Sequence, residues 1–207
     1  SANSLIINAS SAGKVDGTQI SNFEAINTLD GNDSVTVNNS ATALALNAGN
    51  GTDSLTSTTT ADILNVSGAN AGSLGSIAFS NLENVTLGAG NDTATIATGA
   101  SLTALSGGAG TDTLNTNGSA NTTTINSSSS GAVDGTAISS FERIDLKGGD
   151  DNATVDLLNP ASTSKSLLLD GGDGLDDLDI KISEQDFVKL QNTDALSKLD
   201  SYLTDPN

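Results

Sequence analysis

The sequence predicts an all-β fold: a parallel β-helix or β-roll solenoid of about nine coils, built from three copies of a 59-residue repeat. The first observation is the repeat itself, because Phe23 recurs as Leu82 and then as Phe141, each 59 positions further on. The second is a finer spacing of about 20 residues between Gly/Asp turn signals, which divides each copy into three coils. The third is composition: 35% hydrophobic and 2% aromatic residues suit a narrow stacked core better than a wide one.

The strands are predicted from short segments in which apolar and polar residues alternate. Such segments are rich in Val, Ile, Leu and Thr, and Gly, Asn and Asp separate them. They cover residues 34–37, 44–46, 63–66, 93–96 and 177–182. Phe23, Leu82 and Phe141 are expected to form a structural ladder that points into the core. A disordered Ser/Thr/Asn/Gly linker is the alternative, but it gives no reason for apolar residues to recur in register.

Two parts of the chain depart from the repeat. The solenoid is expected over residues 1–182, with a short insertion near residues 159–163, where Pro160 suits a loop. Residues 183–207 are expected to form a helical cap or tail, which Ser183 could begin as an N-cap. A cap would cover the open strand edges at the end of the solenoid. A secretion signal or a partner-docking helix is the alternative for this tail.

The charge of the chain narrows the class of partner. The formal net charge is −18, and no Lys or Arg occurs from residue 15 to residue 142. Such a surface repels phosphate backbones and anionic lipid heads, so nucleic acid and direct membrane insertion are not expected. The chain contains no His, Cys or Met, which excludes a Ser–His–Asp triad, a Cys nucleophile and the usual zinc sites. Divalent cations are the natural partner, although an acidic surface also serves solubility alone.

Gly/Asp motifs recur at the predicted turns. Residues 107–115 and 171–179 match the nonapeptide G-G-x-G-x-D-x-U-x, and residues 48–56 miss only its first glycine. In these motifs the chain resembles the RTX (repeats-in-toxin) family of calcium-binding β-roll proteins. The segments around Phe23, Leu82 and Phe141 are similar to stretches between such motifs in large secreted bacterial surface proteins. Unlike the family, each coil here has about 20 residues and one motif. The turns before Asp33 and Asp151 lack the first two glycines, and the turn before Asp92 lacks the first.

The resemblance implies calcium as the cofactor. Calcium prefers six to eight oxygen ligands, and glycine turns can direct backbone carbonyls toward an ion while aspartate adds charge. The strongest expected pairs of adjacent coils are Asp33 with Asp53, Asp92 with Asp112 and Asp151 with Asp176. The alternative is that these aspartates hydrogen-bond local backbone amides. The full set of expected metal-site residues is Gly31, Asp33, Gly49, Gly51, Asp53, Gly90, Asp92, Gly108, Gly110, Asp112, Gly149, Asp150, Asp151, Gly172, Asp173, Gly174 and Asp176.

Function is expected to be structural, without catalysis. The resemblance indicates a calcium-stabilised segment of an extracellular bacterial cell-surface protein, such as an S-layer subunit or a repeat adhesin. Self-assembly and cell-surface polysaccharide stay open as partners. The first alternative is a non-catalytic RTX or β-helix module of a secreted enzyme, although Arg143, Lys147 and Lys165 show no clustering in the sequence. A minor alternative is a threonine face, marked by Thr36, Thr95 and Thr154, that binds ice or carbohydrate.

Overall fold

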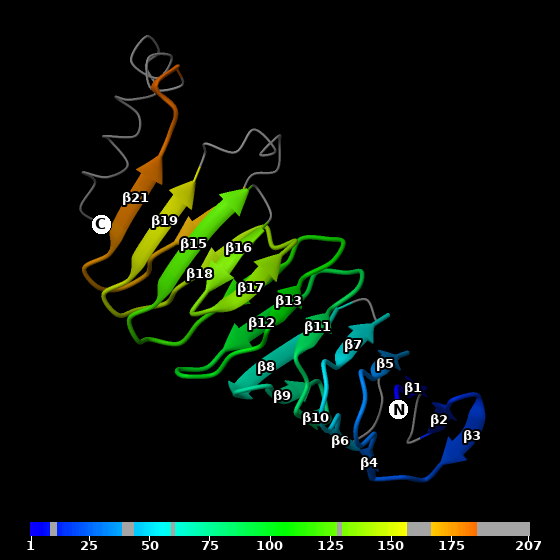
Figure 1. Cartoon of the computed structure of the whole chain (residues 1–207). Coiled ribbons are helices and arrows are strands. Elements are labelled where there is room, and N and C mark those ends of the chain that lie inside the picture. Colours follow the sequence, from blue (N-terminus) through cyan, green and yellow to red (C-terminus); the bar gives the residue numbers. More distant parts are fainter. Residues whose placement is uncertain (9–11, 39–43, 59–60, 128–129, 157–166, 186–207) are drawn as a thin grey trace.

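The strands of the chain stack into two long sheets that face each other (Figure 1). The computed structural model describes residues 1–8, 12–38, 44–58, 61–127, 130–156 and 167–185. All of the strands β1 to β21 lie in this part of the chain, and it is all-β apart from a two-residue helical start at residues 184–185. The predicted fold class is therefore confirmed in its main features: all-β, with extensive parallel pairing typical of a β-solenoid.

Each 59-residue copy contributes seven strands. The first copy supplies β1 (Ser4–Ile7), β2 (Ala12–Val15), β3 (Thr18–Ser21), β4 (Ala25–Asn27), β5 (Ser34–Val37), β6 (Leu44–Asn47) and β7 (Ser54–Ser57). The second supplies β8 (Ile63–Gly68), β9 (Ala71–Leu74), β10 (Ile77–Ser80), β11 (Asn84–Thr86), β12 (Thr93–Ile96), β13 (Ala104–Ser106) and β14 (Thr113–Asn115). The third supplies β15 (Thr122–Ser127), β16 (Ser130–Val133), β17 (Thr136–Ser139), β18 (Arg143–Asp145), β19 (Asn152–Asp156), β20 (Leu168–Asp170) and β21 (Asp177–Lys181).

An antiparallel meander opens each copy. β8 pairs with β9 and β9 pairs with β10, both antiparallel, before β10 rejoins the parallel stack beside β6. β15, β16 and β17 repeat this arrangement, and β1, β2 and β3 begin it in the first copy. Asp16-Gly17 and Asp134-Gly135 are among the Gly/Asp signals at which the sequence predicts coil turns. They are instead two-residue hairpin turns with positive φ at both positions, the geometry that Asp-Gly favours. The expected count of about nine uniform coils is therefore not confirmed.

Equivalent residues of successive copies alternate between the two sheets. Two of the seven connections from β1 to β8 stay within the meander, and the other five change sheets. Five is an odd number, so the chain enters the next copy in the opposite sheet. β1 and β15 lie in the twelve-stranded sheet, whereas β8 lies in the nine-stranded sheet. Residues 59 positions apart therefore do not stack directly on one another. Direct neighbours are about 20 or 30 positions apart: Leu55 lies between Val35 and Val85.

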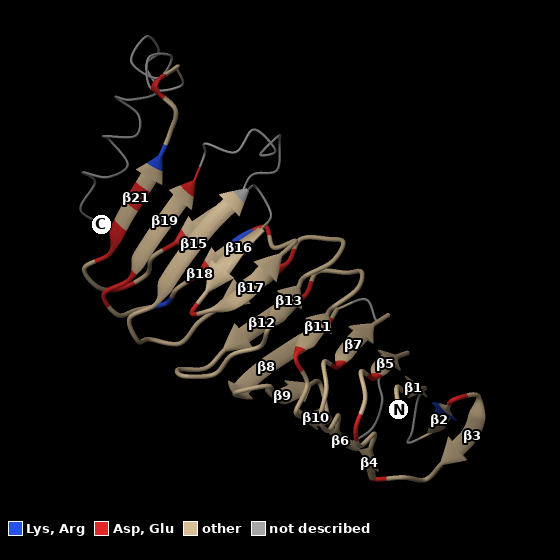
Figure 2. Cartoon of the chain, in the orientation of Figure 1, with Lys and Arg blue, Asp and Glu red and all other residues tan. Residues whose placement is uncertain are grey.

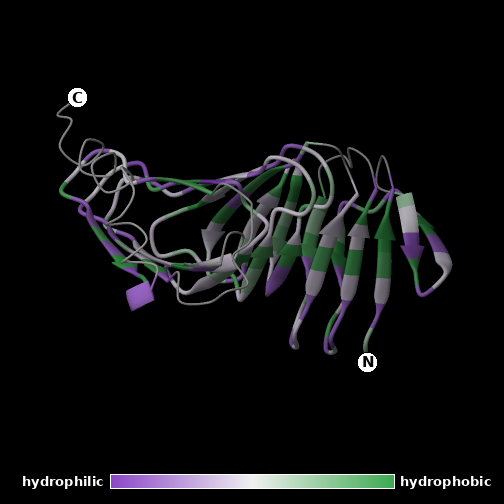
Figure 3. Cartoon of the chain, turned by 90° about the horizontal axis from the view of Figure 1, so that it is seen from above, coloured by the Kyte–Doolittle hydropathy of each residue, from purple (hydrophilic) through white to green (hydrophobic). Residues whose placement is uncertain are grey.

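The core is the narrow layer between the sheets. Along β5, Val35 and Val37 are buried while Ser34 is exposed, the alternation that a strand with one inward face requires. Figure 3 shows this banding on strand after strand. The buried side chains are mostly Leu, Val, Ile and Ala, with Phe79 and Phe141 as the only aromatic side chains in the described core. The predicted narrow aliphatic core is therefore present.

The expected Phe23–Leu82–Phe141 ladder is wrong for Phe23. Leu82 and Phe141 are 0% and 2% exposed, but Phe23 is 48% exposed. Phe23 lies between β3 and β4, and these strands are the last ones of their respective sheets. No neighbouring strand in the described residues covers it. Leu82 and Phe141 also precede strands of different sheets, β11 and β18, so the three positions do not form one column.

Two expectations fall on residues outside the described part of the chain. These are the insertion near residues 159–163 and most of the helical tail, from residue 186 onward. Within the described residues, no helix is long and apolar enough to cross a membrane.

Candidate functional site

Rows of carboxylates run along the stack, at the turns that lead into the strands. Acidic residues, red in Figure 2, occur at these turns along the length of the molecule. Each aspartate of a row lies an even number of positions before the inward-facing residues of the strand that follows it. Its side chain is therefore on the same face of the sheet as theirs. Asp33, for example, is buried like Val35 and Val37 on β5. Period-two alternation thus points these carboxylates inward.

The first row enters the twelve-stranded sheet, and each of its carboxylates accepts a hydrogen bond from the coil before it. The backbone N–H of Asn3 donates to Asp33 Oδ1 at 2.6 Å, and the N–H of Asp33 donates to Asp53 Oδ1 at 2.6 Å. Glu83 closes the row, since its Oε2 accepts the N–H of Asp53 at 2.8 Å. Charge-assisted bonds of this kind are stronger than those between neutral groups.

The second row enters the nine-stranded sheet and repeats this pattern 59 residues later. The N–H of Asp62 donates to Asp92 Oδ1 at 2.7 Å, and the N–H of Asp92 donates to Asp112 Oδ1 at 2.8 Å. The N–H of Asp112 then donates to Glu142 Oε2 at 2.8 Å. Asp62 is not among the metal-site residues expected from the sequence. The repeat does contain a signal for it, because Asp62 lies 59 positions from both Asn3 and Asn121, which begin the other two rows.

The third row joins Asn121, Asp151 and Asp176. Their bonds measure 2.7 Å from the Asn121 N–H to Asp151 Oδ1 and 3.1 Å from the Asp151 N–H to Asp176 Oδ1. The structure therefore places the three expected pairs, Asp33 with Asp53, Asp92 with Asp112 and Asp151 with Asp176, on adjacent strands. The alternative from the sequence, bonding to local backbone amides, is not what these residues do. The Oδ1 atom of each aspartate accepts a backbone N–H that lies 20 to 30 positions away, on the adjacent coil.

The second carboxylate oxygen is the unusual feature of the rows. Oδ2 of Asp33, Asp53, Asp92 and Asp151 is buried and has no hydrogen-bond partner among the described residues. A buried polar atom without a partner is costly, and a buried charge more so. Each of these four residues is at most 2% exposed. The rows thus hold negative charge in the interior that nothing in the described protein neutralises.

The pKa values of three row members respond to this environment. Burial raises the pKa of Asp53, Asp92 and Asp151 above the ordinary value of 3.8, against the lowering effect of the amide that each one binds. Neighbouring carboxylates add to the rise, such as Asp33 beside Asp53 and Asp112 beside Asp92. A cation or a proton at these positions would relieve the same unfavourable energy.

The glycines of the motif are explained by close stacking. At Gly107, an added Cβ would overlap the carbonyl oxygen of Ser140 in the neighbouring coil, and it would also lie 2.8 Å from Oδ2 of Asp112 in the same turn. At Gly110, φ is +149° and an added Cβ would overlap the carbonyl oxygen of Gly90 in the coil below. The remaining motif glycines expected at the site, Gly31, Gly49, Gly51, Gly90, Gly108, Gly149, Gly172 and Gly174, also have positive φ.

A second, outer row ties the same turns together. Asn32 Oδ1 accepts the N–H of Thr52, and Asn91 Oδ1 accepts the N–H of Thr111, both at 3.0 Å. Asp150 holds the equivalent position in the third copy, where its Oδ1 accepts the N–H of Leu175 at 3.0 Å. The expected extra ligand Asp150 is therefore part of the turn-to-turn bonding. Asp173 is exposed and joins its neighbouring coil through backbone bonds with Lys147 and Gly149.

The donor atoms at these turns fit calcium in kind. They are carboxylate oxygens from adjacent coils, together with backbone carbonyls of glycine-rich turns, the oxygen ligands that calcium prefers. Two carboxylates meet at each expected pair, and no group of three or more acidic, His or Cys side chains suited to an ion exists within the described residues. Most of an ion's ligands at such a turn would have to be carbonyls and water.

Two other sequence hypotheses concerned the basic residues and the threonines. Arg143 Nη2 and Lys147 Nζ both bind Asp145 Oδ2, at 3.2 and 2.8 Å, so these two cations lie together although the sequence shows no clustering. Arg143 Nη2 also binds Asp170 Oδ2 at 2.9 Å. Lys165 lies outside the described residues. Thr36 on β5 and Thr154 on β19 belong to the twelve-stranded sheet, whereas Thr95 on β12 belongs to the other. The three threonines therefore do not share one face.

Comparison with known proteins adds no relative: the chain matches no model of a protein family, and no curated protein or solved structure is significantly similar to it.

Proposed function

We propose that this chain is a structural, non-catalytic segment of an extracellular bacterial cell-surface protein, and that calcium stabilises it at the stacked aspartate turns. The stack of strands supports the structural part, because repeats that contact mainly their neighbours form elongated bodies with long lateral surfaces. The likeness of the Gly/Asp motifs to RTX repeats supports the cell-surface setting.

One observation carries the calcium part: Oδ2 of Asp33, Asp53, Asp92 and Asp151 is buried without a hydrogen-bond partner. These carboxylates lie in a chain of net charge −18. Asp33 with Asp53, Asp92 with Asp112 and Asp151 with Asp176 would hold the ions, with carbonyls of the glycine turns as further ligands. A bound ion would supply positive charge at buried carboxylates, and binding to the folded state alone stabilises that state.

Thermal unfolding of the full chain in calcium and in a chelator tests the proposal. At a free calcium concentration 100 times the dissociation constant, one site adds about 2.7 kcal/mol, so the melting temperature should rise by several degrees. Magnesium should do much less, because its octahedral geometry and tight hydration suit it poorly to a site rich in carbonyls.

A double substitution, Asp92→Asn with Asp112→Asn, locates the effect. Asn keeps an Oδ1 acceptor for the backbone amide but removes the negative charge, so this variant should lose part of the calcium response while staying folded in chelator. Asp30→Asn is the matched control, because Asp30 is exposed and, within the described part of the chain, its Oδ1 accepts a hydrogen bond from the side chain of Asn50. Equal melting temperatures with calcium and with chelator in the unsubstituted chain would refute the calcium part.

A further inference from the structure

One end of the stack carries an uncovered apolar face. β3 ends the twelve-stranded sheet and β4 ends the nine-stranded sheet. Phe23, between them, is 48% exposed, whereas its equivalents Leu82 and Phe141 are 0% and 2% exposed. Ile20 on β3 and Ile26 on β4 are likewise only half-buried. The repeat thus provides two internal examples of how this same face looks when it is covered.

The covering element in both examples is the end of the preceding copy. β6 pairs with β10 and β7 pairs with β11, both parallel, where the second copy meets the first. β13 pairs with β17 and β14 pairs with β18 in the same way, where the third copy meets the second. The face formed by β3 and β4 therefore fits strands equivalent to β13 and β14.

Strands of that kind lie at the other end of the same chain. β20 and β21 are equivalent to β13 and β14, because β20 pairs with β18 as β13 pairs with β11, and β21 pairs with β19 as β14 pairs with β12. They are the last strands of their sheets in the described residues. Leu168, Leu178 and Ile180 on them are 52%, 43% and 39% exposed.

We propose that a second copy of this chain docks its β20 and β21 onto β3 and β4, so that the two sheets continue from one molecule into the next. The internal junctions fix the register. The pairing of Leu105 with Ile138 predicts Leu169 beside Ile20, and the pairing of Leu114 with Ile144 predicts Leu178 beside Ile26. This interface goes beyond the proposed structural role and does not depend on calcium.

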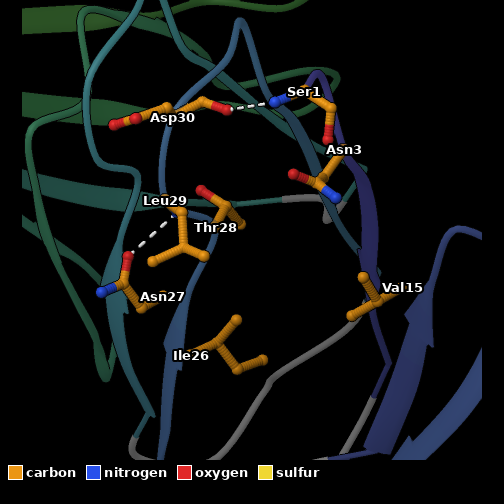
Figure 4. A pocket seen from close by; sticks show the side chains of 8 residues that line it. All are labelled: Ser1, Asn3, Val15, Ile26, Asn27, Thr28, Leu29 and Asp30. Carbon is orange, nitrogen blue, oxygen red and sulfur yellow. Dashed lines mark hydrogen bonds between the residues drawn. The ribbon is translucent and has the colours of Figure 1, made fainter.

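A pocket on the accepting face has the shape and chemistry for this partner. It measures about 390 Å³ and lies among Val15, Ile26, Thr28 and Leu29, with Ser1, Asn3 and Asp30 at its polar side (Figure 4). In the second copy the equivalent positions Leu74, Val85 and Leu87 are buried, and Val85 pairs with Leu55 of β7. By the same register, Leu178 and Ile180 of the second molecule would enter the pocket.

A polar contact would form at the same junction. Glu83 and Glu142 each accept the backbone N–H of an aspartate in the preceding copy, Asp53 and Asp112. Glu24 is their equivalent but is exposed and accepts no such bond within the described residues. In the docked pair, Glu24 would accept the N–H of Asp176, the equivalent of Asp112, from the second molecule. The junction would then be completed as it is inside the chain.

The symmetry of the interface predicts open-ended assembly. The face of β3 and β4 differs from the face of β20 and β21, so the contact is head-to-tail and each added molecule presents a new free face. β21 belongs to the twelve-stranded sheet and β4 to the nine-stranded sheet, so the second molecule is rotated to join its twelve-stranded sheet to the nine-stranded sheet of the first. Because both faces carry acidic residues, salt should strengthen association by screening their repulsion.

Sedimentation of the full chain over a wide concentration range, at about 0.15 M salt, tests the proposal. The average mass should rise with concentration beyond that of a dimer. Phe23→Asp blocks the accepting face and Leu178→Asp blocks the docking face, and each should weaken self-association about tenfold or more. A mixture of the two variants retains one intact pair of faces, so it should form a one-to-one dimer and stop there.

Ile63→Asp is the matched control, because Ile63 is 62% exposed on β8, away from both end faces. It should assemble like the unsubstituted chain, and circular dichroism should show all three variants folded. A monomer at every concentration would overturn the proposal, since it would mean that another segment covers one of the faces. So would a mixture of the two blocked variants that stays monomeric. Neither outcome bears on the calcium test, which is read from the melting temperature.

Discussion

At the residue scale, the aspartate of each strong turn serves two roles through its two carboxylate oxygens. Oδ1 of Asp92 binds the backbone amide of Asp62 in the coil before it, while its Oδ2 is buried without a hydrogen-bond partner. The first oxygen stabilises the stack and the second opposes it while the group is charged. The balance between the two depends on what neutralises the carboxylate, which is a proton at low pH and, in our proposal, calcium at neutral pH.

The stability of the chain in chelator should therefore rise as the pH falls from about 7 toward the ordinary Asp value. Folding raises the pKa of Asp53, Asp92 and Asp151 above 3.8, so the folded state holds these protons more tightly than the unfolded state. Their unfavourable contribution is complete above the raised values and disappears as the pH falls through them toward 3.8. Melting temperatures measured across this range in chelator check the prediction.

Two other groups set the lower limit of that window. Bonds from the Ser4 amide and the Asn3 side chain lower the pKa of Asp16, so its contribution is lost as the pH falls below 3.8. Burial opposes ionisation of Asp145, but bonds from Lys147 and Arg143 outweigh it and lower its pKa too. A melting temperature that falls steadily from neutral pH downward in chelator would contradict the assigned cost of the buried carboxylates.

Substitution of a single motif glycine tests whether the turns are closely stacked. Gly110→Ala should destabilise the chain by more than about 3 kcal/mol, since the new Cβ would overlap the Gly90 carbonyl and φ is +149°. Gly118→Ala is the control, because an added Cβ there would lie 3.9 Å from the Gly148 oxygen and φ is not in the positive region. The effect of this substitution should stay within about 1 kcal/mol. Urea unfolding of both variants measures the difference. Equal effects would mean that the turns are not closely stacked.

At the element scale, the strands follow from the sequence but their partners do not. Alternation over residues 34–37 and 93–96 predicts β5 and β12 with their observed bounds. The meander was missed because Asp16-Gly17 and Asp134-Gly135 were assigned to coil turns, although Asp-Gly between short apolar segments is a hairpin signal. In the middle copy the equivalent turn contains Gly75 and no aspartate, which weakens that signal. The sheet to which a strand belongs depends on how many times the chain has changed sheets before it. A meander stays in one sheet, whereas a full coil visits both, so one missed meander changes every later assignment.

Equivalent positions in the repeat should therefore differ in their energetic importance. Phe141→Ala should cost about 3–5 kcal/mol, because the side chain is 2% exposed in the core. Phe23→Ala should cost less than about 1 kcal/mol in dilute monomer, because that side chain is 48% exposed at an edge. Chemical unfolding at low protein concentration measures the free energy of unfolding of both variants, which are changed at equivalent positions of the repeat. Similar losses would show that a neighbouring segment covers Phe23.

At the scale of the whole molecule, the described strands form a linear stack with one continuous core and two different edge faces. Composition and repeat spacing were enough to predict such a stack and the adjacency of Asp33 with Asp53. They could not predict the exposure of Phe23, since burial at that position depends on the strand beside it and not on local sequence. Glu83 and Glu142 lie 59 positions apart, and each one accepts a backbone N–H from an aspartate of the preceding copy. Their common role agrees with their equivalent positions in the repeat.

The central claim is that the buried aspartates of adjacent strands form a cation-responsive row. A crystal structure of the full chain grown with calcium, with anomalous scattering recorded, tests it most directly. The account predicts an anomalous peak beside the carboxylates of Asp92 and Asp112, and equivalent peaks at Asp33 with Asp53 and at Asp151 with Asp176. Well-ordered carboxylates at these pairs without any such peak would contradict it.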